Sequence, residues 1–530
     1  MGYRNSNSQN NSSHKISSQE SERPGEIAVP SLAVELPRSA IQYRDREGRD
    51  QSMSRRKRFG VSVLMGLWVM AVVSPSFAAS LFPHDPLHTL KSTPSDQGAF
   101  WTLKGSACAD LPKPGENWTL TDVVNRALCE NPQTRQTWAN TLQQAAQLGV
   151  TQSAYLPSVD LSATESRSKV VLDNGFVQNP AQSQFNPTVT LNYLLFDFGA
   201  RSAASQSISQ QLLAADWTHN ETLQTVMLSA IQAYYQLFAA QESVTATLAS
   251  EKSAQQAYDA AVYRHKVGAA ALSDELQART AYSQALLNRQ KAQGDERVAE
   301  GTLANVVGLE ADTSVTLAPP VLVKPTATDV RSVRELIDAA KIARPDLAAA
   351  QAQVNAERAA VRQAKANGLP TFPLFANYGH NYYSDSINNS HSWSIGVSVD
   401  VPLFTGFSDT YKIRAAQASL ESSQAAQNLL AQQVALDVWS AYQNLQTALS
   451  TYDSATDLLA SSTEAERVAL DRYKLGAGSI LDLLTAEANL ANARLQLIQA
   501  QFSWYTSRAS LAKAIGQLQP DKLQAVTGDH

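Results

Sequence analysis

Side chains that commonly carry out chemistry are few in this 530-residue chain, and they form no catalytic or metal-binding pattern. The two cysteines, Cys108 and Cys129, are too few for a disulfide scaffold or a multi-cysteine metal site. The eight histidines are scattered, and the sequence has no nucleophile elbow and no glycine-rich phosphate loop. A net charge of −5 gives no sign of a nucleic-acid-binding surface. We therefore expect a protein that is not an enzyme, holds no metal or cofactor and binds no nucleic acid.

The N-terminal part of the sequence has the layout of an exported protein. Residues 1–52 are polar and lack apolar periodicity, so we expect a disordered leader, with Met53 as a candidate for the true start. A basic cluster then precedes an apolar run and small residues that end near Ala78, which is typical of a secretory signal peptide over 53–78. The apolar run is short for a membrane span, although a single membrane anchor is the alternative.

Export would place the two cysteines in a compartment where disulfides form. They lie on either side of two prolines and close to a helix start near Thr119. We expect a Cys108–Cys129 disulfide that holds an N-terminal extension, residues 79–118, against the first helix. Two unrelated free thiols are the alternative.

Two short segments with Gly, Ser and Asp, residues 263–278 and 472–486, interrupt very long helical patterns. The four residues that end the first pattern line up with the four that end the second: Lys266, Val267, Gly268 and Ala269 with Lys474, Leu475, Gly476 and Ala477. A glycine at such a break allows a helix to end in a left-handed conformation. Ser273 and Ser479, with Asp274 and Asp482 after them, are expected to cap the next helix. Each segment is therefore predicted to be the tip of a helical hairpin.

From Leu120 onward the sequence reads as two copies of one unit. Residues 120–157 match 333–370 at an offset of 213, and later positions such as Gly268 and Gly476 match at an offset of 208. The offset changes between the first helix and the later elements, so the two copies differ in length there. A tolerated difference in length indicates a loop. The expected segments are a leader (1–52), a signal peptide (53–78), an N-terminal extension (79–118), repeat 1 (119–318), a linker (319–330), repeat 2 (331–518) and a C-terminal tail (519–530).

Apolar and polar residues alternate between the first helix and the long helices of each copy. The apolar set is Val189, Leu191, Tyr193 and Leu195 in the first copy and Trp393, Ile395, Val397, Val399 and Val401 in the second. Strands near 158–169 and 371–383 precede these sets, so each copy contributes a two-stranded hairpin. Four strands with one apolar and one polar face suit a membrane barrel built from several chains. A soluble β-sandwich is the alternative, because its strands alternate as well.

Long helical patterns follow each strand pair, at 200–264 and 271–307 in the first copy and at 408–473 and 480–515 in the second. At about 1.5 Å per residue, a 65-residue helix spans on the order of 100 Å. The last helix has two apolar seams, so it needs a partner on each side, as in a closed ring of helices. A plain coiled-coil rod is the alternative, but it does not explain the strand pairs. The expected fold is mainly α with a small β part: a duplicated unit of long antiparallel coiled-coil helices plus two β-hairpins that contribute to a β-barrel.

This order of elements, which occurs twice after a signal peptide, resembles the TolC family of outer-membrane efflux and secretion channels. The resemblance covers residues 120–518, and three motifs carry it most specifically. They are Leu195-Phe196-Asp197-Phe198-Gly199, Pro402-Leu403-Phe404-Thr405-Gly406 and Tyr473-Lys474-Leu475-Gly476 followed by Ser479-Ile480-Leu481-Asp482-Leu483-Leu484.

The resemblance implies a homotrimer with a twelve-stranded barrel in the lipid of the outer membrane and a twelve-helix tunnel in the periplasm. The chain would then be the exit duct of a tripartite efflux pump or a type I secretion system. Its expected partners are a periplasmic adaptor (membrane fusion) protein and an inner-membrane transporter of the RND or ABC class. The host would be a Gram-negative bacterium.

The resemblance also assigns roles to residues near the second tip. Asp482 occupies the place of a carboxylate that narrows the closed end of the tunnel, whereas Thr485 stands where a second carboxylate is usual. A helix-start cap is the alternative role for Asp482. Tyr473 matches a tyrosine that latches the closed entrance, but Gly478 stands at the position of the partner arginine. Simple packing of the ring is the alternative for Tyr473.

The two tips match motifs that adaptors grip in this family. The residues concerned are Val267, Gly268 and Ala269 in the first tip and Leu475, Gly476 and Ala477 in the second. A tight turn without a docking role is the alternative for both. The rival to the channel as a whole is a periplasmic coiled-coil adaptor or scaffold without a pore. It would share the helices and tips, but it would lack two strand pairs and would usually carry a lipoyl-like domain, which is not found in the sequence.

Overall fold

The computed structural model describes residues 85–92, 108, 111, 115–169, 182–319, 332–384 and 389–520. The chain divides into two units, Met1–Phe82 and Pro83–His530, and everything below concerns the second. The predicted leader and signal peptide lie outside the described residues, as do most of the linker, most of the N-terminal extension and the tail from residue 521.

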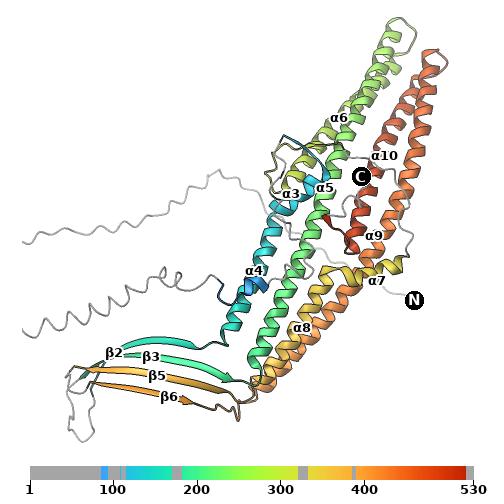
Figure 1. Cartoon of the computed structure of the whole chain (residues 1–530). Helices are drawn as coiled ribbons and strands as arrows, with labels where there is room; N and C mark the ends of the chain where they lie inside the picture. Colours follow the sequence, from blue (N-terminus) through green and yellow to red (C-terminus); the bar gives the residue numbers. More distant parts are fainter. Residues whose placement is uncertain are drawn as a thin grey trace, which may run out of the picture. The chain divides into compact units, whose positions relative to one another are not determined.

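Two copies of the same series of elements follow one another along the chain (Figure 1). The first copy contains α3 (Leu120–Glu130), α4 (Pro132–Ser153), β2 (Ser158–Ser168), β3 (Gln182–Phe196), α5 (Ala200–Lys266) and α6 (Leu272–Val306). The second contains α7 (Val333–Ala343), α8 (Pro345–Ala366), β5 (Phe372–Tyr383), β6 (Ser390–Val397), α9 (Ser408–Lys474) and α10 (Ile480–Ala514). Short elements are η1 (Thr89–Ser92), β1 (Asn117–Trp118) and β4 (Thr316–Leu317). The predicted long helices are confirmed to within a few residues at each end.

The first helix of each copy is broken in two, which corrects the expectation of a single helix before the strands. α3 and α7 both begin with capping boxes, formed by Thr119 with Asp122 and by Ser332 with Glu335. The break follows because a proline begins both α4 and α8. Proline has no amide hydrogen for the preceding turn and forces the residue before it into an extended conformation.

The far end of each long hairpin docks on this break. Gly308, after α6, and Gly516, after α10, have positive φ angles of 80° and 71°. A Cβ atom at Gly308 would lie 2.7 Å from the carbonyl oxygen of Glu130, and one at Gly516 would lie 2.8 Å from that of Ala343. Both positions therefore require glycine for two reasons, the left-handed backbone and the close approach of another main chain.

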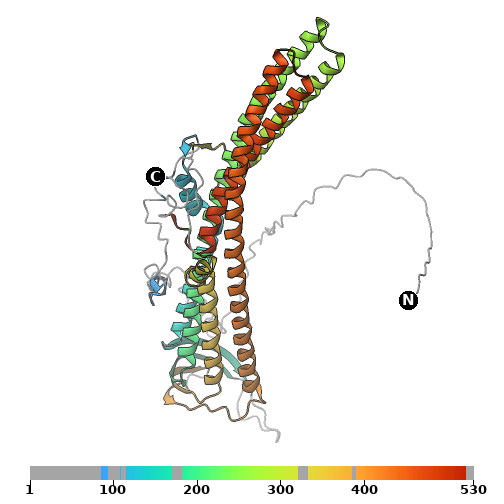
Figure 2. The same cartoon turned by 90° about the vertical axis from the view of Figure 1, so that its right-hand side faces the viewer.

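The long helix α5 lies at the centre of the packing. It contacts α3, α4, α6, α8 and α10, while α9 contacts α7, α8 and α10 (Figure 2). The largest core cluster lies where α3, the middle of α5 and the ends of α6 and α10 meet. Its largest fully buried members are Trp118, Met227, Ile231, Tyr234, Leu237, Leu303, Trp504 and Leu518. Among the helices of the described residues, none combines the length and the apolar character needed to cross a bilayer.

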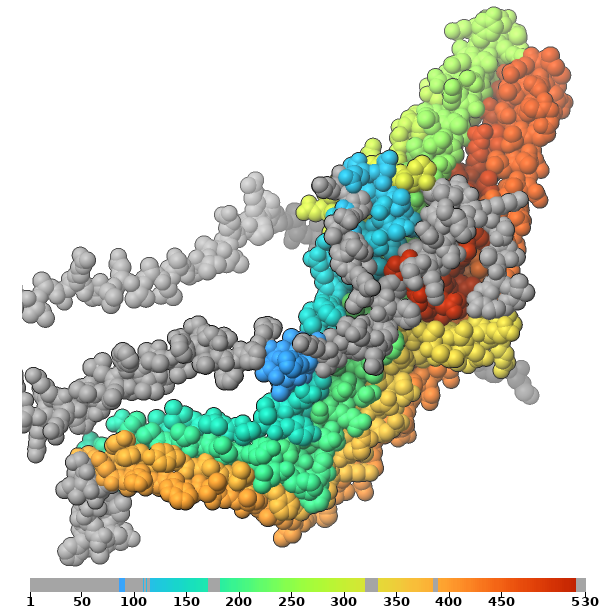
Figure 3. All heavy atoms as spheres, viewed as in Figure 1, coloured from blue at the N-terminus to red at the C-terminus, as the bar shows by residue number. Residues whose placement is uncertain are grey.

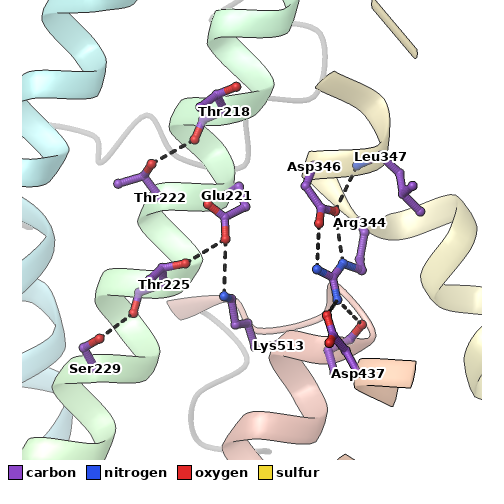
Figure 4. A network of polar contacts seen from close by, with 11 residues as sticks. Thr218, Glu221, Thr222, Thr225, Ser229, Arg344, Asp346, Leu347, Asp437 and Lys513 are labelled. Carbon is purple, nitrogen blue, oxygen red and sulfur yellow. Dashed lines mark hydrogen bonds and ion pairs between the residues drawn. The ribbon is translucent and has the colours of Figure 1, made fainter. Parts of the chain in front are cut away.

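A charged network joins the second copy's break to its long helices (Figure 4). The Arg344 guanidinium bonds both carboxylate oxygens of Asp346, at 3.0 and 2.6 Å, and reaches Asp437 on α9 at 3.1 Å. These two carboxylates raise the pKa of Arg344 even though burial opposes the charge. Lys513, near the end of α10, forms a 3.3 Å ion pair with Glu221 on α5. Arg344 also donates to the Ala514 carbonyl at 3.5 Å, so these contacts together tie α5, α8, α9 and α10 to one another.

Two further contacts hold the start of the unit. Cys108 and Cys129 form a disulfide, with their Cα atoms 5.9 Å apart, and so attach the extension to α3. β1 and β4 pair in parallel, which places the buried Trp118 beside Leu317.

We predict that the two close-approach glycines are far less replaceable than the tip glycines. Gly516→Ala should lower the free energy of unfolding by roughly 2–4 kcal/mol, because the new Cβ strains the backbone and overlaps a carbonyl oxygen. Gly476→Ala is the matched control: its φ is 75°, but no atom lies within 4 Å of a Cβ, so it should cost about 1 kcal/mol. Urea unfolding of the detergent-solubilised protein measures both. Equal losses in the two variants would contradict the docking of α10 on the break.

A buried carboxylate on α5 makes stability depend on pH. Asp216, Asn220 and Gln224 follow one another at four-residue spacing on one face of α5, and each is less than 7% exposed. Burial raises the pKa of Asp216 from 3.8 to about 6. The folded chain therefore holds this proton more tightly than the unfolded chain does. Its contribution to stability is complete below about pH 4 and is lost as the pH rises through 6.

Asp216→Asn should therefore raise the free energy of unfolding at pH 8 by roughly 1–2 kcal/mol and change it little at pH 4. The neutral amide removes the cost of a buried charge at high pH but matches the protonated acid at low pH. Urea unfolding at the two pH values tests this, with the exposed Asp295→Asn as the control. A gain of equal size at both pH values would be inconsistent with a raised pKa.

Candidate functional site

The four long strands form one antiparallel sheet in the order β2-β3-β5-β6 (Figure 1). β3 pairs with β5, so the sheet joins the hairpins of the two copies through their inner strands. Among the described residues, no strand pairs with the outer edge of β2 or of β6. Four strands thus leave two edges with unpaired main-chain groups.

In the middle rows of this sheet each face has one character, as the alternation in the sequence predicts, although His380 and His391 also lie on the apolar face and Phe375 on the polar one. Residues directly opposite each other on neighbouring strands share a face. The register sets two rows of four on one face, Leu161–Val189–Tyr378–Trp393 and Val159–Leu191–Ala376–Ile395. Rows on the other face are polar or small, namely Asp160–Thr190–Asn377–Ser394 and Ser162–Thr188–Gly379–Ser392. On the apolar face, Trp393 is 71% and Leu161 68% exposed, so in the single chain nothing covers them.

Three residues, 197–199, connect β3 to α5, whereas ten residues, 398–407, connect β6 to α9, and both connections end in a turn directly before the helix. Two consecutive residues in each turn have positive φ angles, Phe198 and Gly199 in the first copy and Gly406 and Phe407 in the second. In the first copy the buried Asp197 accepts hydrogen bonds from the amides of Gly199 and Arg201 and pairs with the Arg201 guanidinium at 3.0 Å. These bonds satisfy the free amides at the start of α5 and fix the angle between strand and helix.

The tips lie at the other end of the long helices, where Figure 3 shows them in green and orange. Both tips use the same backbone turn. The Ala269 amide bonds the Arg264 carbonyl at 2.8 Å, and the Ala477 amide bonds the Arg472 carbonyl at 2.9 Å. Gly268 and Gly476 both have a φ of 75°, as expected of a helix that ends in a left-handed residue.

The start of the second helix differs between the tips. Ser479 caps α10 together with Asp482, as predicted: the Asp482 amide donates to the Ser479 hydroxyl at 3.1 Å. The expectation for Ser273 is wrong, because the cap position of α6 is Ala271 and no side chain caps it. Ala271 is the counterpart of Ser479 at the offset of 208, so the first copy lacks a hydroxyl at the cap position.

The residues proposed for a constriction lie on the exposed first turns of α10. Asp482 is exposed, and its carboxylate accepts a long 3.4 Å bond from the Ser479 amide, which leaves most of its charge toward solvent. The Thr485 hydroxyl donates to the Leu481 carbonyl of its own helix. Asp482 also lines a hollow of about 450 Å³ with Glu464, Arg472 and Gly478.

Tyr473 has a partner that sequence reasoning missed. Tyr473 is 7% exposed, and Arg264 of the first hairpin lies over its ring, with the guanidinium carbon 4.2 Å from the ring centre. The same guanidinium donates to the Tyr473 carbonyl at 2.8 Å. The sequence does carry a signal that would have indicated a role for Arg264 at the tips: it aligns with Arg472, which ends the other long helix.

Glu487 is a second residue that the sequence analysis missed. It lies one turn after the buried Leu483, and one of its carboxylate oxygens is buried with no hydrogen-bond partner in the described part of the chain. Burial, together with the nearby Glu466 on α9, raises the pKa of Glu487 from 4.5 to about 7. An acidic residue on the apolar side of the helix is the signal that would have singled it out. Across the described ranges, no three His, Cys, Asp or Glu side chains gather as metal ligands would.

Comparisons with known proteins agree with this geometry. Residues 123–309 and 336–517 match the profile of the family described as outer membrane efflux protein. Protein CyaE of Bordetella pertussis is 28% identical over 470 residues, which cover 87% of this chain and 96% of that protein. Outer membrane protein TolC of Escherichia coli is 23% identical over 426 residues, or 77% of this chain and 84% of that protein.

Solved structures share the fold. The Campylobacter jejuni CmeC outer membrane channel superimposes with a TM-score of 0.69 at 20% identity, over 77% of this chain and 89% of that one. The open state of the Neisseria gonorrhoeae MtrE outer membrane channel gives a TM-score of 0.66 at 20% identity, over 76% and 90%. The family profile covers most of the chain and matches each copy of the repeated unit separately. This chain therefore belongs to the outer membrane efflux protein family and is a TolC-like channel of the outer membrane whose helices extend into the periplasm.

Proposed function

We propose that three copies of this chain assemble into a homotrimer. The observation that carries the proposal is the four-stranded sheet, whose middle rows form one apolar and one polar face and whose two outer edges are unpaired among the described residues. In a bilayer, unpaired main-chain groups cost several kcal/mol each, so a sheet there must close on itself. Four strands are too few to close a barrel, whereas twelve strands from three chains close one, with the apolar face toward outer-membrane lipid.

In this proposal the helices of the trimer form a tunnel that serves as the exit duct of a tripartite efflux pump or a type I secretion system. A periplasmic adaptor protein would dock at the tips, and an inner-membrane RND or ABC transporter would supply the cargo. The tips suit this role because Val267 and Leu475 are 59% and 84% exposed beside glycines with open space around them. An apolar side chain next to bare backbone allows another hairpin to approach closely.

We further infer that the chain catalyses no reaction and reaches the outer membrane through the signal peptide at 53–78. Its relatives are channel proteins, and the reactive side chains of the sequence form no catalytic pattern, which supports the first point. For Asp482 we propose two roles together, a cap of α10 and a ring of three carboxylates at the narrow end of the tunnel. The cap uses the backbone amide of Asp482 and only a long 3.4 Å bond to its carboxylate, so the exposed charge remains available to passing ions.

We predict that the parent protein shows discrete, cation-selective conductance steps in a planar bilayer, and that Asp482→Asn weakens the cation preference by roughly threefold or more. A narrow passage with low-dielectric walls concentrates the field of a few charges, so one carboxylate per chain has a strong effect. Asp274→Asn, at the same position of the first tip, is the control and should keep the parent's selectivity. Unchanged selectivity in Asp482→Asn would rule out the ring, and the absence of any steps from the parent would count against the channel itself.

Replacing both tip glycines should block transport without preventing assembly. In the variant with Gly268→Leu and Gly476→Leu, bulky side chains would stand where an adaptor must approach the backbone. We expect cells with this variant as their sole channel of the family to accumulate ethidium at the level of cells without the channel. Gly294→Leu, at an open position in the middle of α6, is the control and should export ethidium as the parent does. Export at the parent's rate by the tip variant would argue against docking there.

A further inference from the structure

The two hairpins of the chain carry an arginine at the same place, but the two arginines make different contacts. Arg264 and Arg472 occupy the last turns of α5 and α9 and align at the offset of 208. Arg472 stays within its own tip and donates to the Ala477 carbonyl at 3.5 Å. Arg264 crosses to the second hairpin, where its Nη2 donates to the carbonyls of Tyr473 at 2.8 Å and Lys474 at 3.4 Å.

The crossing contact has two physical parts. The last carbonyls of a helix lack partners within it and carry the negative end of the helix dipole, so a guanidinium from outside satisfies and stabilises the end of α9. The flat guanidinium also lies on the Tyr473 ring, a cation–π contact. The ring itself is packed into a small apolar cluster that spans both hairpins and includes Ala257, Ala261, Ala278, Ile480 and Leu483.

Among the described residues, the counterpart of Tyr473 in the first hairpin makes no such crossing contact. It is His265, whose Nδ1 lies 2.6 Å from a carboxylate oxygen of Glu275 on α6, within the same hairpin. The two tips therefore make different contacts. His265 and Arg472 bond within their own hairpins, whereas Arg264 and Tyr473 join one hairpin to the other.

We propose that Arg264 is a positioning residue that keeps the tip of the α9–α10 hairpin against the α5–α6 hairpin and so holds the tunnel entrance narrow. This inference rests on the proposed channel function. Arg264 contacts the face of the Tyr473 ring and the last carbonyls of α9, not the tyrosine hydroxyl. Gly478 has no side chain to form such a contact from the second tip, and a Cβ there would already lie 3.1 Å from the Cβ of Arg472.

The proposal predicts how single channels of the full-length protein behave in a planar bilayer. Arg264→Ala should raise the fraction of time spent in the high-conductance state roughly tenfold, because one cation–π contact and one charged hydrogen bond are lost. Arg264→Lys should fall between the parent and Arg264→Ala, since it keeps the charge without the flat, forked group. Arg472→Ala is the matched control and should behave as the parent does.

Two variants of the ring separate this contact from a latch that depends on the hydroxyl. Tyr473→Phe keeps the ring and the main-chain carbonyl, so the entrance should stay as narrow as in the parent. Tyr473→Ala should resemble Arg264→Ala. Opening by Tyr473→Phe, or parental gating in Arg264→Ala, would overturn the inference about Arg264.

The outcomes also distinguish this inference from the proposal on which it rests. No conductance steps from the parent would overturn the channel function, whereas steps in the parent with no effect at Arg264 would overturn the inference alone. The temperature of unfolding, followed by circular dichroism, should be nearly the same for Arg264→Ala and Arg472→Ala. If Arg264→Ala does not fold, Arg264→Lys and the two Tyr473 variants decide the question in the same way.

Discussion

Main-chain groups in the interior of a bilayer have no water to bond, so every strand there needs a partner on both edges. In this chain β3 and β5 meet that requirement through each other and through β2 and β6, whose outer edges have no partner among the described residues. The rest of the architecture is coupled to this requirement. β3 passes into α5 through a turn of three residues held by Asp197, and β6 reaches α9 through ten residues, so closing the sheet also sets the long helices side by side.

Duplication explains how one chain supplies two such strand–helix units. The contact between the end of each long hairpin and the broken first helix shows which residues each unit cannot replace. Gly308 and Gly516 have no room for a side chain, because the end of each long hairpin rests on the main chain at the broken first helix. Around this shared contact the side chains have diverged. Asn131 donates to the Val306 carbonyl at 2.9 Å, whereas its counterpart Arg344 holds two carboxylates and ties in α9.

The tips show the same division between a preserved backbone and changed side chains. Both turns use a left-handed glycine and the same amide-to-carbonyl bonds, which depend on the backbone alone. The side chains around the turns differ, as Ala271 against Ser479 and His265 against Tyr473 illustrate. The two tips therefore share a backbone but differ in side chains, and the two hairpins contact each other through Arg264 of one and Tyr473 of the other.

The sequence by itself determined the elements, the duplication, the hairpin tips and the two faces of the strands, because these follow from local backbone preferences and from periodicity along a single segment. It missed the breaks at Pro132 and Pro345, although the prolines were visible there, since a proline can kink a helix or end it. Only the tertiary structure placed Arg264 on Tyr473, and Glu487 opposite Glu466. Both pairs join different helices, and Arg264 and Tyr473 are 209 residues apart in the sequence. Which side chains meet is decided by packing between helices rather than by the pattern within one.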